Sequence, residues 1–319
     1  MRKPSELRDK KSSEPEEVKY RLRRAKPADL PELWRVYWDA DHGPRTEMPD
    51  IPVPPIFRHE LETGRVWVAE DEEGIAGFTA AITRGDVTYL AELFVRRGRQ
   101  SAGLGRTLLR RAMPPRGRGV RCALSSKDPR ALSLYIQSGM LPRWPNFQLQ
   151  APEPRLDELP VPDVQVVEAD PSDRRTMARL ARWDARIGGR ERSRDVAYWL
   201  DQTDARPVWL TRRGRTIGYA FMSLRRHGRK GPGLAILGPI GSATVRDSAA
   251  CVFATCRWAR AAGHGLYLAV PGPHPALRPL FSAGFQIIDL ETFVSSSDRD
   301  FADPRRYIAS GGPEGSSLY

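Results

Sequence analysis

Apolar and polar positions follow one order of patterns, and that order occurs twice along the chain. The first copy begins at Tyr20 with a short strand, a Pro-x-Asp turn and an amphipathic helix over residues 30–38, and the second begins in the same way at Val164, with its helix over residues 174–186. In both copies, two apolar strands separated by a charged turn with glycine follow. Near the end of each copy, residues 131–140 and 276–285 align without a gap. The pattern therefore predicts an α/β domain duplicated in tandem.

Two kinds of segment interrupt this pattern and mark the domain boundaries. Residues 1–18 are charged and lack apolar periodicity, which predicts a disordered tail. Residues 151–163 contain four prolines and four acidic residues, which predict a semi-rigid linker. We therefore expect a first domain over residues 19–150, a second over residues 164–309 and a disordered tail over residues 310–319.

Composition is that of an ordinary soluble protein. The 319 residues are 40% hydrophobic and 28% charged, and prolines and glycines interrupt the longest uncharged stretch, so we expect no membrane span. The N-terminus lacks the apolar region of a secretory signal. Three cysteines, Cys122, Cys251 and Cys256, do not suggest a disulfide framework, and no Cys/His spacing is typical of zinc. The sequence predicts a reduced, cytoplasmic protein without a metal.

The net charge of +12 is compatible with an anionic partner. Arginine is, however, spread along the whole chain, and no patch alternates basic with aromatic residues as in single-strand binders. The charge therefore does not predict nucleic-acid binding, and nothing in the sequence supports an oligomer.

The segment after the apolar strand at residues 89–95 has the character of an anion-binding loop. A polar loop with Gly103 and Gly105 leads directly into a helix, which Pro114 and Pro115 end. Glycines allow close approach of the backbone, and the first turn of a helix has free N–H groups and a partial positive charge. The loop is neither a G-x-G-x-x-G nor a P-loop motif. It predicts a pyrophosphate site of another kind.

The residues of this loop resemble a family signature. Gln100-x-x-Gly103-x-Gly105 is similar to the Gln/Arg-x-x-Gly-x-Gly/Ala motif of the GCN5-related N-acetyltransferases, the GNAT family. Downstream, the family has N-x-x-A-x-x-x-Y-x-x-x-G-F, and this chain has Asp128, Ala131, Tyr135, Gly139 and Met140. Asp replaces Asn and Met replaces Phe, and Asp128 retains the chemistry of a helix N-cap.

The resemblance implies two tandem GNAT-like domains, each a mixed, mostly antiparallel twisted sheet flanked by helices. The fourth and fifth strands of the first domain would splay apart, with acetyl-CoA as co-substrate in the gap and an amine acceptor on the other side. Its pantetheine arm would pair with the strand edge as an added strand does. The implied cofactor-binding residues are Leu93, Phe94 and Val95 for the arm, Gln100, Ser101, Ala102, Gly103, Leu104, Gly105 and Arg106 for the pyrophosphate, and Asp128.

Acetyl transfer needs a group that takes a proton from the amine and one that protonates the leaving thiolate. The resemblance places Tyr135 near the sulfur as general acid, and the alternative is a tyrosine that only packs its helix. Glu92 is the candidate base, since it lies in an apolar strand beside the splay, where a carboxylate takes up a proton more readily. The alternative is an outward charge on a solvated face.

The second copy lacks both features. It has no Q-x-x-G-x-G loop, and Leu280 stands where Tyr135 stands in the first copy. We expect it to be a degenerate domain that packs on the first and lines the acceptor site.

These observations predict an acetyl-CoA-dependent N-acetyltransferase that acts on a primary amine of a small molecule or peptide through its N-terminal domain. The alternative is a catalytically silent acyl-CoA sensor. Residues 39–50 follow the first helix, where the family shapes the acceptor pocket. We expect a solvated loop there, and Asp41, His42, Glu47 and Asp50 are the alternative grip on a cationic amine.

Overall fold

The computed structural model describes residues 20–43, 46–48, 50, 52–100, 103–202, 205–224, 234–262 and 265–309. The tails predicted over residues 1–18 and 310–319 lie outside the described residues. Within the described part of the chain, no helix has the length and apolar character needed to cross a membrane.

The elements follow the two predicted copies in order. The first half contains β1 (Arg21–Arg24), α1 (Leu30–His42), α2 (Pro55–Thr63), β2 (Arg65–Asp71), β3 (Gly74–Arg84), β4 (Val87–Val95), α3 (Leu104–Ala112), β5 (Val120–Ser125), α4 (Pro129–Gln137) and β6 (Leu141–Ala151). The second half contains β7 (Gln165–Glu168), α5 (Arg174–Gly188), α6 (Ser193–Gln202), β8 (Arg206–Arg212), β9 (Arg215–Leu224), β10 (Leu234–Ser242), α7 (Val245–Ala261), β11 (Gly265–Pro271), α8 (Leu277–Ser282), β12 (Gln286–Ser295) and β13 (Tyr307–Ile308).

Side-chain caps start several helices at the predicted places. Asp128 accepts a hydrogen bond from the backbone N–H of Arg130 at 2.9 Å and begins α4. Asp173 and Thr244 cap α5 and α7 in the same way. Each cap satisfies a backbone donor that has no partner within its helix.

The strands form one mixed, mostly antiparallel sheet. Its order is β1-β2-β3-β4-β5-β12-β6-β11-β10-β9-β8-β7, and β13 pairs with β10 outside this path. Among the strand pairs of the described residues, β4–β5 and β10–β11 are parallel and the others antiparallel. The predicted class, a mostly antiparallel α/β fold with helices on the sheet, is confirmed.

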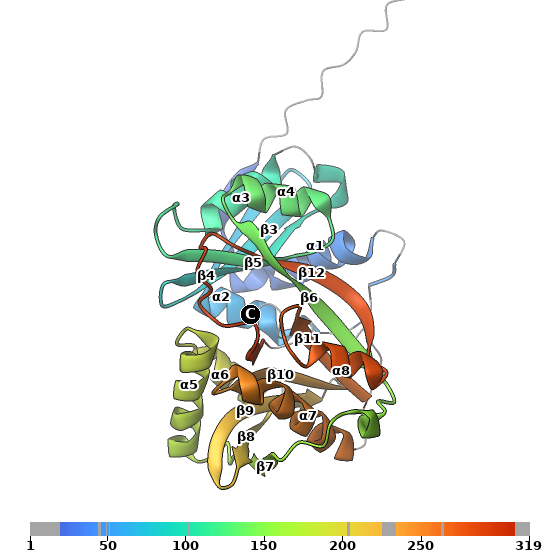
Figure 1. Ribbon diagram of the computed structural model, residues 1–319. Helices are drawn as coiled ribbons and strands as arrows, with labels where there is room; N and C mark the ends of the chain where they lie inside the picture. The colour runs from blue at the N-terminus through green and yellow to red at the C-terminus, as the bar shows by residue number, and fades with distance from the viewer. Residues whose placement is uncertain are drawn as a thin grey trace, which may run out of the picture.

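The two halves exchange their last long strands. In chain order β6 belongs to the first half, yet it pairs with β11 and β12, whereas β12 pairs with β5. Figure 1 shows the first half at the top, the second below, and β6 and β12 running between them. At the junction the rings of Trp144 and Phe293 stack with centroids 4.5 Å apart. One continuous sheet therefore joins the halves, which the sequence pattern did not predict.

The predicted linker is packed against the second half. Residues 151–163 carry the end of β6 and a 3-10 turn at Leu156–Glu158. Arg257 of α7 donates to the carbonyl oxygens of Leu156 and Leu159 at 2.6 and 2.9 Å. These bonds hold the segment on α7.

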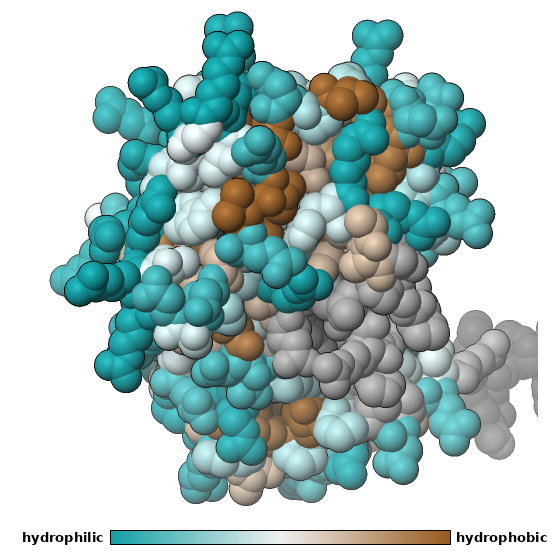
Figure 2. Space-filling model, turned by 90° about the horizontal axis from the view of Figure 1, so that it is seen from below, coloured by the Kyte–Doolittle hydropathy of each residue, from teal (hydrophilic) through white to brown (hydrophobic). Residues whose placement is uncertain are grey.

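The helices bury three apolar regions. Side chains of α1, α2, α5 and α6 share one core with both halves of the sheet, and Trp34, Trp199 and Phe221 belong to it. The opposite face of the first half is covered by α3 and α4, and the second half is covered by α7. The face of the molecule in Figure 2 is mainly hydrophilic, with its apolar residues in small separate patches.

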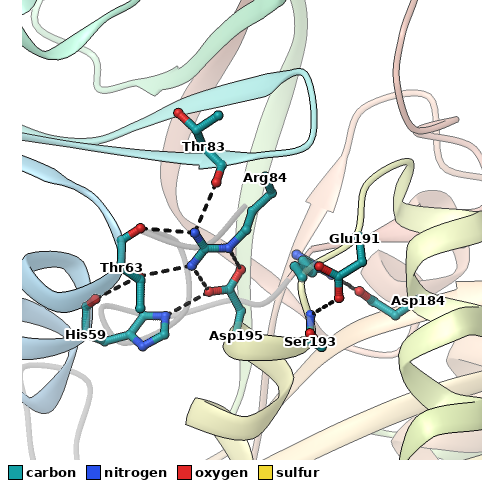
Figure 3. Close-up of polar contacts among 9 residues, drawn as sticks. His59, Thr63, Thr83, Arg84, Asp184, Glu191, Ser193 and Asp195 are labelled. Carbon is teal, nitrogen blue, oxygen red and sulfur yellow. Dashed lines mark hydrogen bonds and ion pairs between the residues drawn. The ribbon is translucent and has the colours of Figure 1, made fainter.

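A buried ion cluster ties α2 and β3 to α6. The Asp195 carboxylate lies 2.8 Å from His59 Nε2 and accepts a hydrogen bond from Arg84 Nε at 2.9 Å. Figure 3 shows Asp195 facing both residues, with Thr63 beside Arg84. Burial alone would raise the pKa of Asp195, but the hydrogen bonds from His59 and Arg84 bring its pKa below the usual value. The cluster links the first half to the second.

Candidate active site

A gap opens between β4 and β5, as expected from the resemblance. The parallel pairing runs from Val87 and Val120 to Leu90 and Ala123, and then stops, although β4 continues to Val95. On its other side, this part of β4 remains paired with β3. The edge of β4 that carries Leu93, Phe94 and Val95 is therefore unpaired on the β5 side, and it is the edge expected to bind the pantetheine arm.

A β-bulge in β4 directs Glu92. Ala80 pairs with Glu92 and Ala81 pairs with Leu90, so Ala91 has no partner on β3. Cross-strand partners lie on the same face of a sheet. Ala80 belongs to the core under α1 and α2, whereas Ala81 packs below α3 and α4. The bulge therefore places Glu92 on the face of α1 and α2, where it is buried.

Tyr135 flanks the gap from the opposite face. It lies on α4 and packs with Leu90, Leu109 and Ala123, and 6% of it is exposed. Its hydroxyl forms no hydrogen bond with a described residue, yet it is not among the buried polar atoms that lack a partner, so the oxygen keeps contact with solvent. Burial raises the pKa of Tyr135, and the nearby charge of Glu92 raises it further. The two candidate catalytic residues are thus neighbours across the gap.

The predicted phosphate loop leads into α3. Gly103 caps the helix with φ +79°, in the left-handed region that favours glycine, and no atom lies within 4 Å of the place a Cβ would take. The N–H groups from Gly103 to Arg106 precede the first intrahelical bond, and Leu104 anchors the turn in the core. Gly105 lies in the same turn. Ser101 and Ala102 lie outside the described residues.

Gln100 and Asp128 hold the loop together rather than point away from it. Gln100 Nε2 donates to the Val95 carbonyl at 3.0 Å, and its Oε1 accepts a hydrogen bond from Arg130 Nη1 at 2.9 Å. Arg130 also forms an ion pair with Asp128, whose pKa is lowered by that side-chain hydrogen bond. The sequence reasoning missed Arg130, although its place two residues after the cap was a usable signal. Arg106 and Arg130 are exposed cations beside the α3 N-terminus.

Three arginines fix the segment before this loop. Arg97 Nε donates to the carbonyl of Asp39 at 3.1 Å, and Arg99 Nε donates to Asp71 at 2.7 Å, which lowers the pKa of that carboxyl. Arg96 is paired with Glu32 of α1. The loop is therefore held on α1 and on the β2–β3 hairpin.

The expected acceptor loop is only partly described. Its first residues end α1, where the His42 ring stacks on Trp38 with centroids 3.6 Å apart, and His42 Nδ1 lies 3.3 Å from the Asp41 carboxylate. Residues 44, 45, 49 and 51 lie outside the described residues. The exposed Glu47 and Asp50 are the other acidic groups of this loop.

The second half closes its own gap. There, β10 and β11 pair up to Leu237 and Leu268. Beyond that point β13 pairs with β10, with Ile308 opposite Ile240. Ile240 pairs with Ala220 of β9 just as Glu92 pairs with Ala80 in the first half. Because Leu280 is also buried on α8, neither candidate catalytic residue has a polar counterpart in the second half.

Comparisons with known proteins agree with this fold. Residues 62–139 match the family model of an acetyltransferase (GNAT) domain. A Pyrococcus horikoshii protein is 15% identical with a TM-score of 0.69, and the match covers 90% of this chain and 92% of that one. A GCN5-related N-acetyltransferase from Sphaerobacter thermophilus is 14% identical with a TM-score of 0.59, covering 91% and 98%. A tandem GNAT protein from the clavulanic acid biosynthesis pathway is 14% identical with a TM-score of 0.55, covering 89% and 100%.

At these identities the solved structures show a common fold. The family match is independent of them and spans α3, most of α4 and the gap between β4 and β5. It supports acyl transfer from acyl-CoA as the general activity. On this match and the fold, the chain belongs to the GNAT family of acetyltransferases.

Proposed function

We propose that the protein is an acetyl-CoA-dependent N-acetyltransferase that transfers the acetyl group directly to a primary amine of a small molecule or peptide. The observation that carries this proposal is the placement of Glu92 and Tyr135 on opposite faces of the gap between β4 and β5. An acid and a base on the two sides of a gap are what transfer between two bound substrates requires.

Residues of the first half account for the binding of acetyl-CoA. The free edge at Leu93, Phe94 and Val95 offers backbone groups to the amides of the pantetheine arm. The first turn of α3 from Gly103 to Arg106 offers N–H groups to the pyrophosphate, and the charges of Arg106 and Arg130 add to its attraction. The open space at Gly103 suits a bulky anion.

Each catalytic residue has one proton to move. Glu92 accepts a proton from the ammonium, directly or through water, so that the amine nitrogen has a free electron pair. The nitrogen attacks the thioester carbonyl, the C–N bond forms and the C–S bond breaks. Tyr135 gives its hydroxyl proton to the leaving thiolate, and its raised pKa keeps that proton in place until the thiolate forms.

The second half is proposed as a degenerate copy. Its β10 edge is occupied by β13, and Ile240 and Leu280 cannot exchange protons. The catalytic and cofactor-binding roles are therefore proposed for the first half alone.

A silent acyl-CoA sensor is the second candidate. The observation that favours it is the burial of Tyr135, since a tyrosine that packs its helix would be buried in the same way. The contact of its hydroxyl with solvent favours catalysis.

The test is release of free thiol from acetyl-CoA with a panel of primary amines, for the wild type and Glu92→Gln. We expect turnover on at least one amine and a loss of roughly 10²–10⁴-fold in kcat in the variant. Calorimetric binding of acetyl-CoA is the control and should not change. Binding without turnover on any amine would support the sensor, and no binding would contradict both candidates.

A further inference from the structure

Arg190 is a buried cation at the boundary between the halves. It lies between α5 and α6, and its exposed fraction is 7%. Among the described residues its guanidinium makes one hydrogen bond, from Nη1 to the Gly188 carbonyl at 3.3 Å. Nε and Nη2 are not among the fully buried polar atoms without a partner, so both keep contact with accessible space. Most of its donors are therefore available to a ligand.

No carboxylate of the described residues neutralises Arg190 by an ion pair. The nearby Asp184 is already engaged, since it accepts hydrogen bonds from Arg192 at 2.7 and 2.8 Å and from Tyr219 at 2.6 Å. Burial lowers the pKa of Arg190, and the charge of Arg192 lowers it further. A buried charge without a partner is costly, and proteins retain one where it has a function.

The contacts of Arg190 place it beside β5. Its guanidinium carbon lies 4.9 Å from the centroid of the Phe301 ring, which packs edge-on against Phe293. Phe293 pairs with Leu124 of β5, the strand that borders the gap. Cys122, two residues earlier and on the same face of β5, is close enough for electrostatic interaction with Arg190.

This face is the one that Glu92 occupies. Cys122 pairs with Tyr89 of β4, and both belong to the core under α1 and α2. Glu92 follows Tyr89 by three residues, which is about 10 Å along a strand. Arg190 and Glu92 thus lie on the same side of the sheet, opposite α3 and α4.

We propose that Arg190 binds an anionic group of the acceptor, so that the substrate is a primary amine that also carries a carboxylate or a phosphate. This inference rests on the acetyl-transfer function proposed above. The guanidinium is planar and presents parallel N–H groups, which match two oxygens of either anion. The second half then supplies the specificity of a site whose chemistry lies in the first half.

The experiment compares three series of acceptors with acetyl-CoA: ω-amino acids of increasing length, alkylamines of matched length, and aminoalkyl phosphates. The proteins are the full-length wild type, Arg190→Gln, and Arg194→Gln as a matched control, because Arg194 is an exposed arginine of the same segment. We expect the wild type to favour an anionic series. Arg190→Gln should raise KM for that series roughly 10- to 100-fold, as for the loss of a charge-assisted hydrogen bond.

The KM for the neutral alkylamines and the affinity for acetyl-CoA should not change in Arg190→Gln. The series with the lower KM distinguishes a carboxylate from a phosphate. Equal use of neutral and anionic amines by the wild type, or an unchanged KM ratio in Arg190→Gln, would overturn this inference while the transferase function stands. A melting temperature of Arg190→Gln below that of both other proteins, with an unchanged KM ratio, would assign Arg190 a structural role instead.

A binding measurement covers the case in which no tested amine reacts. Calorimetry with CoA present would then measure binding of N-acetylated ω-amino acids and acetylated aminoalkyl phosphates. Binding that Arg190→Gln abolishes and Arg194→Gln retains supports the anion site. Absence of binding to the wild type contradicts it, whereas failure of acetyl-CoA itself to bind contradicts the proposed function.

Discussion

Arg84 and Asp195 form a buried ion pair that joins the end of β3 in the first half to α6 in the second. Both residues are almost fully enclosed, and Asp195 is 1% exposed. Removing one partner of such a pair leaves the other charge buried without compensation. The pair therefore sets how firmly the two halves hold together.

Asp195→Ala should lower the free energy of unfolding by about 3–5 kcal/mol, because it strands the Arg84 guanidinium. Denaturant unfolding would measure the change. Glu168→Ala is the control, since Glu168 forms an ion pair with Arg206 at the exposed surface, and such a pair contributes under about 1 kcal/mol. Similar losses in the two variants would contradict the role of the buried pair.

The same carboxylate should give a pH dependence. Its pKa is lowered in the folded protein, so its stabilisation is fully present above the unfolded pKa of about 3.9 and disappears as the pH falls through the lower folded pKa. The difference in unfolding free energy between wild type and Asp195→Asn should therefore shrink below about pH 4. A difference that stays constant down to about pH 3 would show that Asp195 keeps its usual pKa.

Tyr135→Phe should lower kcat roughly 10²–10⁴-fold, because the leaving thiolate loses its proton donor. The affinity for acetyl-CoA should not change. Since burial and the charge of Glu92 raise the pKa of Tyr135, the wild-type rate should not decline through loss of that proton up to about pH 10. Tyr267→Phe, an equally buried tyrosine on β11, is the control and should keep full activity.

Gly103→Ala should weaken acetyl-CoA binding about tenfold, because a Cβ enters the space in front of the α3 N–H groups and misplaces about one hydrogen bond. Gly214→Ala is matched to it, as Gly214 has φ +73° and also has open space around its Cβ position. Both variants should lose about 1–2 kcal/mol of stability from the left-handed backbone. Isothermal calorimetry and denaturant unfolding separate the two effects. Equal acetyl-CoA affinity in both variants would rule out the loop as the phosphate site.

Local signals in the sequence predicted much of this fold. Asp128 and Asp173 begin their helices as expected, and the glycine loop after Val95 leads into α3. These features depend on neighbouring residues, so local chemistry is sufficient to predict them.

Features that depend on distant pairing were not predictable in this way. The bulge at Ala91 sets the side of the sheet on which Glu92 lies, and it arises from the register with β3. The position of β12 beside β5 and the closing of the second gap by β13 are also long-range pairings. Arg190 was missed for the same reason, since nothing near it in sequence shows that it is buried beside β5.

The shared strands β6 and β12 give the molecule an interlocked character. Cutting the chain between residues 151 and 163 would leave two fragments held together by backbone hydrogen bonds, so they should elute as one species in native gel filtration. Either fragment made alone would expose an unpaired sheet edge and tend to aggregate. The gene fusion has thus made each half the folding partner of the other, and the silent half cannot be lost without the active one.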